Sequence, residues 1–192
     1  MKNFHYVLPF KLRKPIYTGL VLCYLIGSSS SANASCRPDI LRTAPTERYI
    51  IHENGTVTDT KTKLMWQRCS VGQSGENCEL NEATRLNWSQ ALQSADSSVD
   101  SGDFAGYSDW RLPNINELSS IVEYACHTPA INTDVFPRTP PNNTDFYWSS
   151  TPVKKKPAES HALYMKQGFI SRNSRESEIF VRLVRSVSDL QL

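Results

Sequence analysis

Three short segments that mix aromatic or β-branched residues with small polar or charged ones constrain the fold of this chain more than any other feature. They are Gly106–Asn114 (GYSDWRLPN), Tyr147–Thr151 (YWSST) and Val181–Arg185 (VRLVR). Large aromatic side chains in strand-like surroundings are more often buried in a core than exposed. The segments therefore predict a packed domain, and they say more about its fold than about its function.

These segments, in the same order, resemble the C-terminal domain family of the Legionella collagen-like adhesin. The other matching parts are Thr58–Trp66, the region of Trp88 and Ala91, Pro129–Asn132 and Phe136–Pro137, so the resemblance extends from about Tyr49 to Arg185. It implies an exported, non-catalytic domain with a C-type-lectin-like fold. In that fold, two helices flank a twisted antiparallel sheet with long loops.

The chain departs from the family at two positions. Lys63 stands where the family usually has glycine, and Leu183 stands where a cysteine is common. A left-handed turn at Lys63 would cost about 1 kcal/mol, and the disulfide pattern of the family cannot be carried over. The collagen-like repeats of the adhesin are also missing here, so its trimeric assembly is not implied.

The N-terminus has the order of a secretory signal peptide. Basic residues precede an apolar run, Ile16–Ile26, and Ala32-Asn33-Ala34 supplies a cleavage site. We expect a signal peptide over residues 1–34, an N-terminal arm over 35–47 and a single domain over 48–192, with the mature protein secreted or periplasmic and starting at Ser35. The apolar run is shorter than the roughly 20 residues of a membrane-spanning helix, and no later stretch could span a bilayer. A lipid anchor on Cys36 is the alternative, but Asn33 stands where such signals have a leucine-like residue.

Four cysteines follow the expected cleavage site, and an even number in an exported chain argues for two disulfides. Of the three possible pairings we favour Cys69–Cys78, which closes a short loop, with Cys36 left to pair with Cys126. The chain-entropy model gives about 3 kcal/mol for the short bridge and about 4.5 kcal/mol for the long one. A zinc site is the alternative, but Cys69 and Cys78 lie further apart than the usual spacing of neighbouring zinc ligands.

The pattern of strands and helices predicts an α+β domain whose terminal strands pair. An Asn54-Gly55 turn joins the first two strands, and one helix is expected after Asn87 and a second after Asn114, where Glu117 completes a capping box. The second helix should bury a face that extends to Ala125. Strands are expected at 48–51, 56–58, 64–69, 147–151, 162–165, 169–172 and 179–184, with an irregular proline-rich stretch at 136–143.

Several residues are expected to serve the core. The four tryptophans of the exported part, Trp66, Trp88, Trp110 and Trp148, could stack on sugars, but their setting favours core packing. Arg111, Glu117 and Arg182 are polar residues in apolar segments. We expect them to form a partly buried ion-pair network that joins the second helix to the last strand.

Motifs for catalysis are weak. The sequence Gly72-Gln73-Ser74-Gly75 approaches the nucleophile elbow of hydrolases, but it lies inside the expected disulfide loop. Cys126-His127 could pair a thiol with a base, yet an exported cysteine with a partner is more often half of a disulfide. Motifs for nicotinamide, ATP and heme are absent, so we expect no enzyme and no cofactor.

Acidic residues gather after the first helix, in a stretch rich in serine and glycine. Oxygen-rich loops of this kind can hold calcium, but the spacing matches no EF-hand and no calcium-dependent lectin motif. We therefore expect a solvated loop and no metal site, with calcium as the alternative. The residues concerned are Asp96, Asp100, Asp103 and Asp109.

Charge is distributed unevenly along the chain. Cleavage at the expected site removes four of the 21 basic residues and none of the 19 acidic ones, which leaves a net charge of −2. Residues 35–153 carry a net charge of −6 and residues 154–192 a net charge of +4. Six basic residues form the centre of the positive part, and we expect a hairpin at Gly168 to gather them toward one end of a sheet. They are Lys154, Lys155, Lys156, Lys166, Arg172 and Arg175.

Such a basic cluster attracts sulfated or phosphorylated polymers through point-charge contacts and counterion release. The sequence therefore predicts an exported, adhesin-like recognition domain that binds an anionic polysaccharide, with a sulfated glycan implied by the resemblance. The alternative is a periplasmic or envelope structural module that binds a protein partner, with the lysines serving only solubility. Export and the negative net charge argue against nucleic acid.

Overall fold

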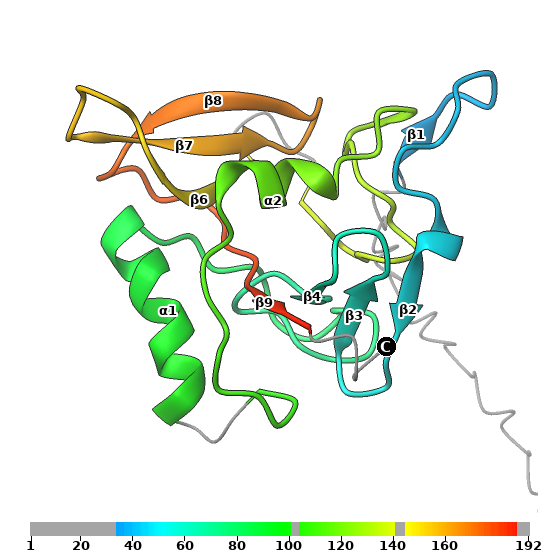
Figure 1. Cartoon of the computed structure of the whole chain (residues 1–192), viewed down its shortest axis with the longest axis horizontal. Coiled ribbons are helices and arrows are strands. Elements are labelled where there is room, and N and C mark those ends of the chain that lie inside the picture. The colour runs from blue at the N-terminus through cyan, green and yellow to red at the C-terminus, as the bar shows by residue number, and fades with distance from the viewer. Residues whose placement is uncertain (1–33, 101–103, 141–144, 188–192) are drawn as a thin grey trace, which may run out of the picture. The chain divides into compact units, whose positions relative to one another are not determined.

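Two antiparallel sheets, a two-stranded ribbon and two helices make up the described part of the protein (Figure 1). The structure is a computed structural model and describes residues 34–100, 104–140 and 145–187, without the side chains of 96–100. The α+β class is confirmed, although two separate sheets stand where a single one was expected. No helix in these ranges is long and apolar enough to cross a membrane. The predicted signal peptide, apart from Ala34, lies outside the described residues.

The first sheet has four strands and contains the predicted N-terminal meander. Its order is β2 (Tyr49–Ile51), β3 (Thr56–Asp59), β4 (Leu64–Gln67) and β9 (Val184–Ser186), all antiparallel. The β2–β3 turn contains Gly55 at a φ of 80°, and the next turn places Lys63 at a φ of 58°. Lys63 thus occupies the left-handed region in which a glycine would be relaxed, as the family pattern suggested.

Both helices begin at an asparagine cap. Asn87 Oδ1 accepts a hydrogen bond from Gln90 N, and Gln90 Oε1 accepts one from Asn87 N, which starts α1 (Trp88–Asp100). Asn114 and Glu117 form the predicted capping box of α2 (Ile115–Ser120). The helix is shorter than its apolar stripe, because Val122 leaves it to bridge Ile131. The remaining stripe residues, Ile121, Val122 and Ala125, are nevertheless buried.

The second sheet consists of three strands in sequence order. They are β6 (Phe146–Pro152), β7 (Glu159–Tyr164) and β8 (Phe169–Ser174). In Figure 1, α2 lies beneath this sheet, and the helix contacts all three strands. Ile115 N donates to Thr151 Oγ1 at 2.9 Å, which ties the start of α2 to β6.

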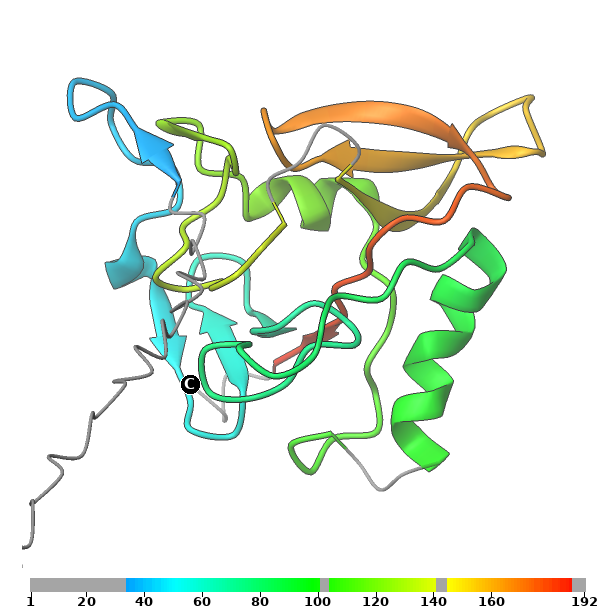
Figure 2. The ribbon, with the colours of Figure 1, turned by 180° about the vertical axis from the view of Figure 1, so that it is seen from behind.

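The C-terminal segment joins the two sheets, as its red trace in Figure 2 shows. Its residues change partner repeatedly: Ile179 bonds with Leu86, Phe180 with Phe146 and Trp148, Val181 with Val71, and Leu183 with Gln67. The predicted strand at 179–184 was therefore wrong in its extent. Only Val184–Ser186 pairs regularly with β4, because the preceding residues connect several elements instead of following one neighbour.

The N-terminal arm packs on the domain through Glu123, whose side chain is fully buried. Its carboxylate accepts hydrogen bonds from Thr43 N (3.1 Å), Ala44 N (2.9 Å) and Ala125 N (3.0 Å). Burial would raise the pKa of Glu123, but the main-chain donors outweigh it and hold the pKa below its ordinary value. The ribbon of β1 (Ser35–Cys36) and β5 (Cys126–His127) holds the start of the arm.

Apolar side chains form two core clusters, and tryptophans are prominent in both. Trp66 lies in the cluster that joins the first sheet to α2, and Trp110 and Trp148 lie in the cluster beside α1. All three are buried, whereas Trp88 is half-buried and donates from Nε1 to Ser149 O at 2.9 Å. The tryptophans thus serve packing, as expected.

Candidate functional site

Three consecutive lysines lie on the turn between β6 and β7, and all three are exposed. The turn is closed by hydrogen bonds from Lys156 N to Val153 O (3.1 Å) and from Glu159 N to Lys156 O (3.0 Å). Lys155 adopts a φ of 62°. The ammonium of Lys156 pairs with Glu159 at 3.2 Å. Lys154 and Lys155 extend from a hydrogen-bonded turn without an ion pair among the described residues.

Two arginines lie at the same end of the sheet as this turn. Arg172 on β8 is opposite His161 on β7, two residues from the last pair of the ladder. Arg175 follows β8 and donates its main-chain N–H to Ala158 O in the turn at 2.9 Å. Its guanidinium is half-buried, lies 3.9 Å from the ring centre of Trp88 and donates from Nε to Ser160 Oγ. We call Lys154, Lys155, Lys156, Arg172 and Arg175 the basic end of the second sheet.

Lys166 does not belong to the basic end, which corrects the expected cluster of six. It lies in the β7–β8 turn, where its carbonyl accepts a hydrogen bond from Thr128 N at 2.8 Å. Five residue steps of β7 separate the two ends of the ladder, or about 17 Å at the usual rise of a strand. Successive turns of a meander lie at opposite ends of its strands, so the hairpin at Gly168 separates Lys166 from the lysine turn.

The expected ion-pair network of Arg111, Glu117 and Arg182 does not form. Arg111 pairs with Glu117, and Arg182 is not part of this pair. Arg111 forms a bidentate pair with Glu117, at 2.8 and 2.7 Å, with side chains 42 % and 18 % exposed. The pair raises the pKa of Arg111. Burial would raise the pKa of Glu117, but the Arg111 guanidinium and Asn114 N hold it below its ordinary value.

Arg182 is fully buried and has no carboxylate partner among the described residues. It donates to the carbonyls of Gln67 and Arg68 and to the hydroxyls of Ser70 and Thr139. Its guanidinium also lies 4.9 Å from the ring centre of Phe136. Burial lowers the pKa of this guanidinium. Arg182 thus joins the end of β4 to the C-terminal segment through neutral acceptors.

The acidic stretch after the first helix is not the loop that the sequence suggested. Asp96 and Asp100 belong to α1, and Asp103 lies outside the described residues. Asp109 accepts a hydrogen bond from Arg185 Nε at 2.6 Å, and the Arg185 guanidinium lies 3.9 Å from the ring centre of Tyr107. Within the described ranges, no three His, Cys, Asp or Glu side chains are grouped as metal ligands would be.

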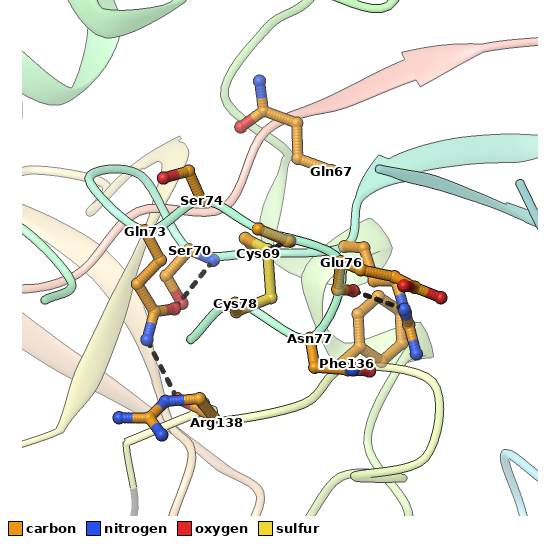
Figure 3. Close-up of a disulfide and its surroundings, with 12 residues drawn as sticks. Gln67, Cys69, Ser70, Gln73, Ser74, Glu76, Asn77, Cys78, Phe136 and Arg138 are labelled. Carbon is orange, nitrogen blue, oxygen red and sulfur yellow. Dashed lines mark hydrogen bonds between the residues drawn. A yellow bond between two sulfur atoms is a disulfide. The ribbon is translucent and has the colours of Figure 1, made fainter. Parts of the chain in front are cut away.

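The two disulfides join Cys36 to Cys126 and Cys69 to Cys78, which is the favoured pairing. Figure 3 shows the shorter bridge and the loop that it closes. Gln73 holds this loop, because its Oε1 accepts from Ser70 N at 3.2 Å and its Nε2 donates to Arg138 O at 3.2 Å. The carbonyl of Glu76 accepts from Arg68 at 2.6 Å. The loop is therefore fixed at both ends and in its middle.

An open groove of about 810 Å³ runs beside this loop, and sequence reasoning missed it. Its walls come from the β2–β3 turn, the end of β4, the disulfide loop and Phe104. Gln67, the last residue of β4, is only 9 % exposed and lines this groove. The one sequence feature that pointed here was a polar glutamine directly after the apolar run Leu64–Trp66.

Comparison with known proteins is consistent with this architecture. The model of the Lcl C-terminal domain matches residues 55–185, which is more than half of the chain. A search of curated proteins gives no significant match. The matched range contains the disulfide loop, both helices, the second sheet and most of the first sheet. The chain belongs to the Lcl C-terminal domain family.

Proposed function

We propose that the protein is an exported, non-enzymatic, adhesin-like recognition domain that binds an anionic polysaccharide through its basic end. The observation that carries this proposal is the row of three exposed lysines on the β6–β7 turn. Arg172 and Arg175 extend the same positive region along the edge of the sheet. A sulfated glycan is the ligand class that the family resemblance implies.

The solvent exposure of the three lysines favours a role in binding an anionic polysaccharide. A lysine that stays in solvent keeps its hydration and can still meet a sulfate group, so binding requires no burial of charge. Glu159 neutralises part of Lys156, and Glu176 and Glu178 follow Arg175 in sequence. The affinity should therefore come mainly from Lys154, Lys155 and Arg172, with Arg175 committed partly to Trp88.

The location and fold class of the proposal have separate support. The two disulfides and the family indicate an extracellular or periplasmic domain. We propose that residues 1–34 are the signal peptide that exports it, with residues 35–47 as the arm and 48–192 as the domain. A C-type-lectin-like fold is part of the proposal, supported by two helices, long irregular connections and the pairing of the C-terminal strand β9 with β4.

The non-enzymatic assignment is supported by the structural roles of the residues considered for catalysis. Cys126 is bonded to Cys36, so its neighbour His127 has no thiol to activate. Ser74 lies in the disulfide loop, and its Oγ accepts a hydrogen bond from Asn81 Nδ2 at 3.2 Å. Neither residue has the arrangement of nucleophile and base that acyl transfer requires.

Heparin binding at two salt concentrations tests the proposal. Exposed charges are screened by salt, so retention on a heparin column should fall by at least about tenfold between roughly 0.1 and 0.5 M NaCl. Chondroitin without sulfate groups is the control ligand and should bind more weakly than heparin. Absence of retention at the lower salt concentration, or retention that salt does not change, would contradict a polyanion site.

A protein partner is the second candidate function, and one observation favours it. The tip of the N-terminal arm carries Leu41 at 90 % exposure beside Ile40, and Tyr124, whose N–H donates to Thr43 in the arm, is also exposed. Exposed apolar groups of this kind are typical of contact surfaces when they gather. If Leu41→Ser abolishes a salt-resistant interaction while heparin binding is absent, the protein-binding module is the better description.

A further inference from the structure

The groove beside the Cys69–Cys78 loop has the size and the build of a ligand site. Its volume of about 810 Å³ lies within the range of pockets that hold small molecules, roughly 300 to 1,000 Å³. The disulfide and the Gln73 hydrogen bonds fix one wall, and the β2–β3 turn fixes the other. This groove lies apart from the basic end, since none of the residues of the basic end lines it.

Gln67 presents a polar amide to the groove. The residue is 9 % exposed and lines the groove, and its side chain forms no hydrogen bond with the described residues, although its main chain is bonded to Leu183 and Arg182. In Figure 3 its amide points away from the disulfide loop and has no partner drawn. The amide faces the groove, where solvent reaches it, so its donor and its acceptor are both available to a ligand that displaces this water.

The other polar groups of the groove restrict the charge of that ligand. Glu53 and Glu76 lie on its rim, exposed and without an ion pair among the described residues, and Asn54 lies beside Glu53. No arginine, lysine or histidine is among the described residues that line it. A sulfate, phosphate or carboxylate would therefore meet two carboxylates and no compensating cation, which excludes the anionic ligand proposed for the basic end.

The Gln67 amide favours a neutral ligand with hydroxyl groups over a cationic one. An amide offers both a donor and an acceptor, so a hydroxyl group can satisfy both, whereas an ammonium group only donates and would leave Nε2 without a partner. Carboxylates accept hydrogen bonds from hydroxyl groups as well. Phe104, Val71 and Leu183 supply apolar surface for the carbon face of a ring. These features together fit a polyhydroxylated, uncharged ring.

We propose that this groove is a second binding site, which takes an uncharged sugar residue of a glycan, with the Gln67 amide at its floor and Glu53 and Glu76 at its rim. Binding there is independent of the polyanion site at the basic end. The domain would then hold a glycan at two separate sites, one that recognises charged groups and one that recognises hydroxyl groups.

Binding of the oxidised protein, residues Ser35 to Leu192, to an array of uncharged oligosaccharides tests this proposal. We expect binding to at least one uncharged hexose oligosaccharide, unchanged between about 0.1 and 0.5 M NaCl because no ion pair forms. Gln67→Leu keeps the volume but removes the amide, and should lower the affinity at least about fivefold, the loss of one neutral hydrogen bond. Lys61→Gln, an exposed lysine outside both the groove and the basic end, is the control and should bind as the wild type does.

Three results would overturn the inference. They are binding to no uncharged oligosaccharide, unchanged affinity in Gln67→Leu, and salt-sensitive binding of polylysine at Glu53 and Glu76, which would mean a cationic ligand. If Gln67→Leu has a lower melting temperature than the wild type, the exposed Glu53→Gln is used instead, with the same expected loss. Heparin binding is measured in parallel, so failure at the groove and failure at the basic end are distinguishable.

Discussion

At the scale of single residues, buried charge is the most unusual property of this protein. Arg182 is buried without a carboxylate, and Glu123 is buried without a basic side chain bonded to it in the described structure. Main-chain N–H groups satisfy Glu123, and carbonyls together with hydroxyls satisfy Arg182. Isolated buried charges cost several kcal/mol unless hydrogen bonds satisfy them, so each of these residues fixes the segments that supply its partners.

We expect Arg182→Met to destabilise the protein more than Arg111→Met. The first removes the donor to two buried carbonyls and to the Thr139 hydroxyl, at about 1–3 kcal/mol for each group that stays unsatisfied, while Ser70 Oγ keeps its bond with Tyr147. The second breaks a partly exposed pair worth about 1 kcal/mol, and Glu117 still accepts from Asn114 N.

Thermal unfolding measures the difference. The melting temperature should fall by at least about 6 °C in Arg182→Met and by about 2–4 °C in Arg111→Met. Lys154→Gln, which changes an exposed lysine of the turn, serves as the control and should leave the melting temperature unchanged. A larger fall for Arg111→Met than for Arg182→Met would show that the roles of the two arginines are reversed.

At the scale of elements, local rules predicted those parts whose partners are close in sequence. The Asn54-Gly55 turn, the capping box of Asn114 and Glu117, and the β7–β8 hairpin all depend on residues a few positions apart. The extent of α2 was wrong because Val122 bridges Ile131, and the path of 179–183 was wrong because distant segments such as Leu86 and Val71 supply its hydrogen bonds. Sequence periodicity carries no information about partners that far away.

The N-terminal arm should be coupled to pH through Glu123. Its pKa is lowered in the folded protein, so its stabilisation is fully present above the unfolded value of about 4.3 and is lost as the pH falls through the folded value. Glu123→Gln should therefore lower the free energy of unfolding at pH 7, and the difference from the wild type should shrink by about pH 3.

Urea unfolding at both pH values tests this coupling, with Glu47→Gln, an exposed residue of the arm, as the control. The control should have the same midpoint as the wild type at both pH values. If the effect of Glu123→Gln is the same at pH 3 as at pH 7, the carboxylate does not hold the arm through its charge.

At the scale of the whole molecule, one disulfide connects the start of the described chain to its middle and the other closes a local loop. Cys36–Cys126 ties the arm to the segment after α2, and Cys69–Cys78 shapes the groove. Part of the candidate site followed from the sequence, since three adjacent lysines are visible there. The separation of Lys166 follows once β6, β7 and β8 form one meander, because successive turns lie at opposite ends of its strands. The groove at Gln67 was not predictable, because it depends on how the β2–β3 turn, the disulfide loop and Phe104 come together.

The exported protein should begin at Ser35 and carry no free thiol. Intact mass after alkylation without reduction measures both properties, and it should equal that of residues 35–192 with two disulfides and no alkyl group. A mass with an alkylated cysteine would contradict the disulfide pairing. A diacylglycerol adduct at Cys36 would replace the predicted cleavage site with a lipid anchor.

The most direct test of the polysaccharide site is the heparin affinity of a variant in which Lys154, Lys155 and Lys156 are all replaced by glutamine. A variant with Arg42, Lys61 and Lys63 replaced by glutamine loses the same charge from exposed positions away from the basic end, and it serves as the control. We predict at least a tenfold loss for the lysine-turn variant, about 1.4 kcal/mol, with an unchanged melting temperature and little loss for the control. Equal affinity of the two variants would contradict a site at the basic end.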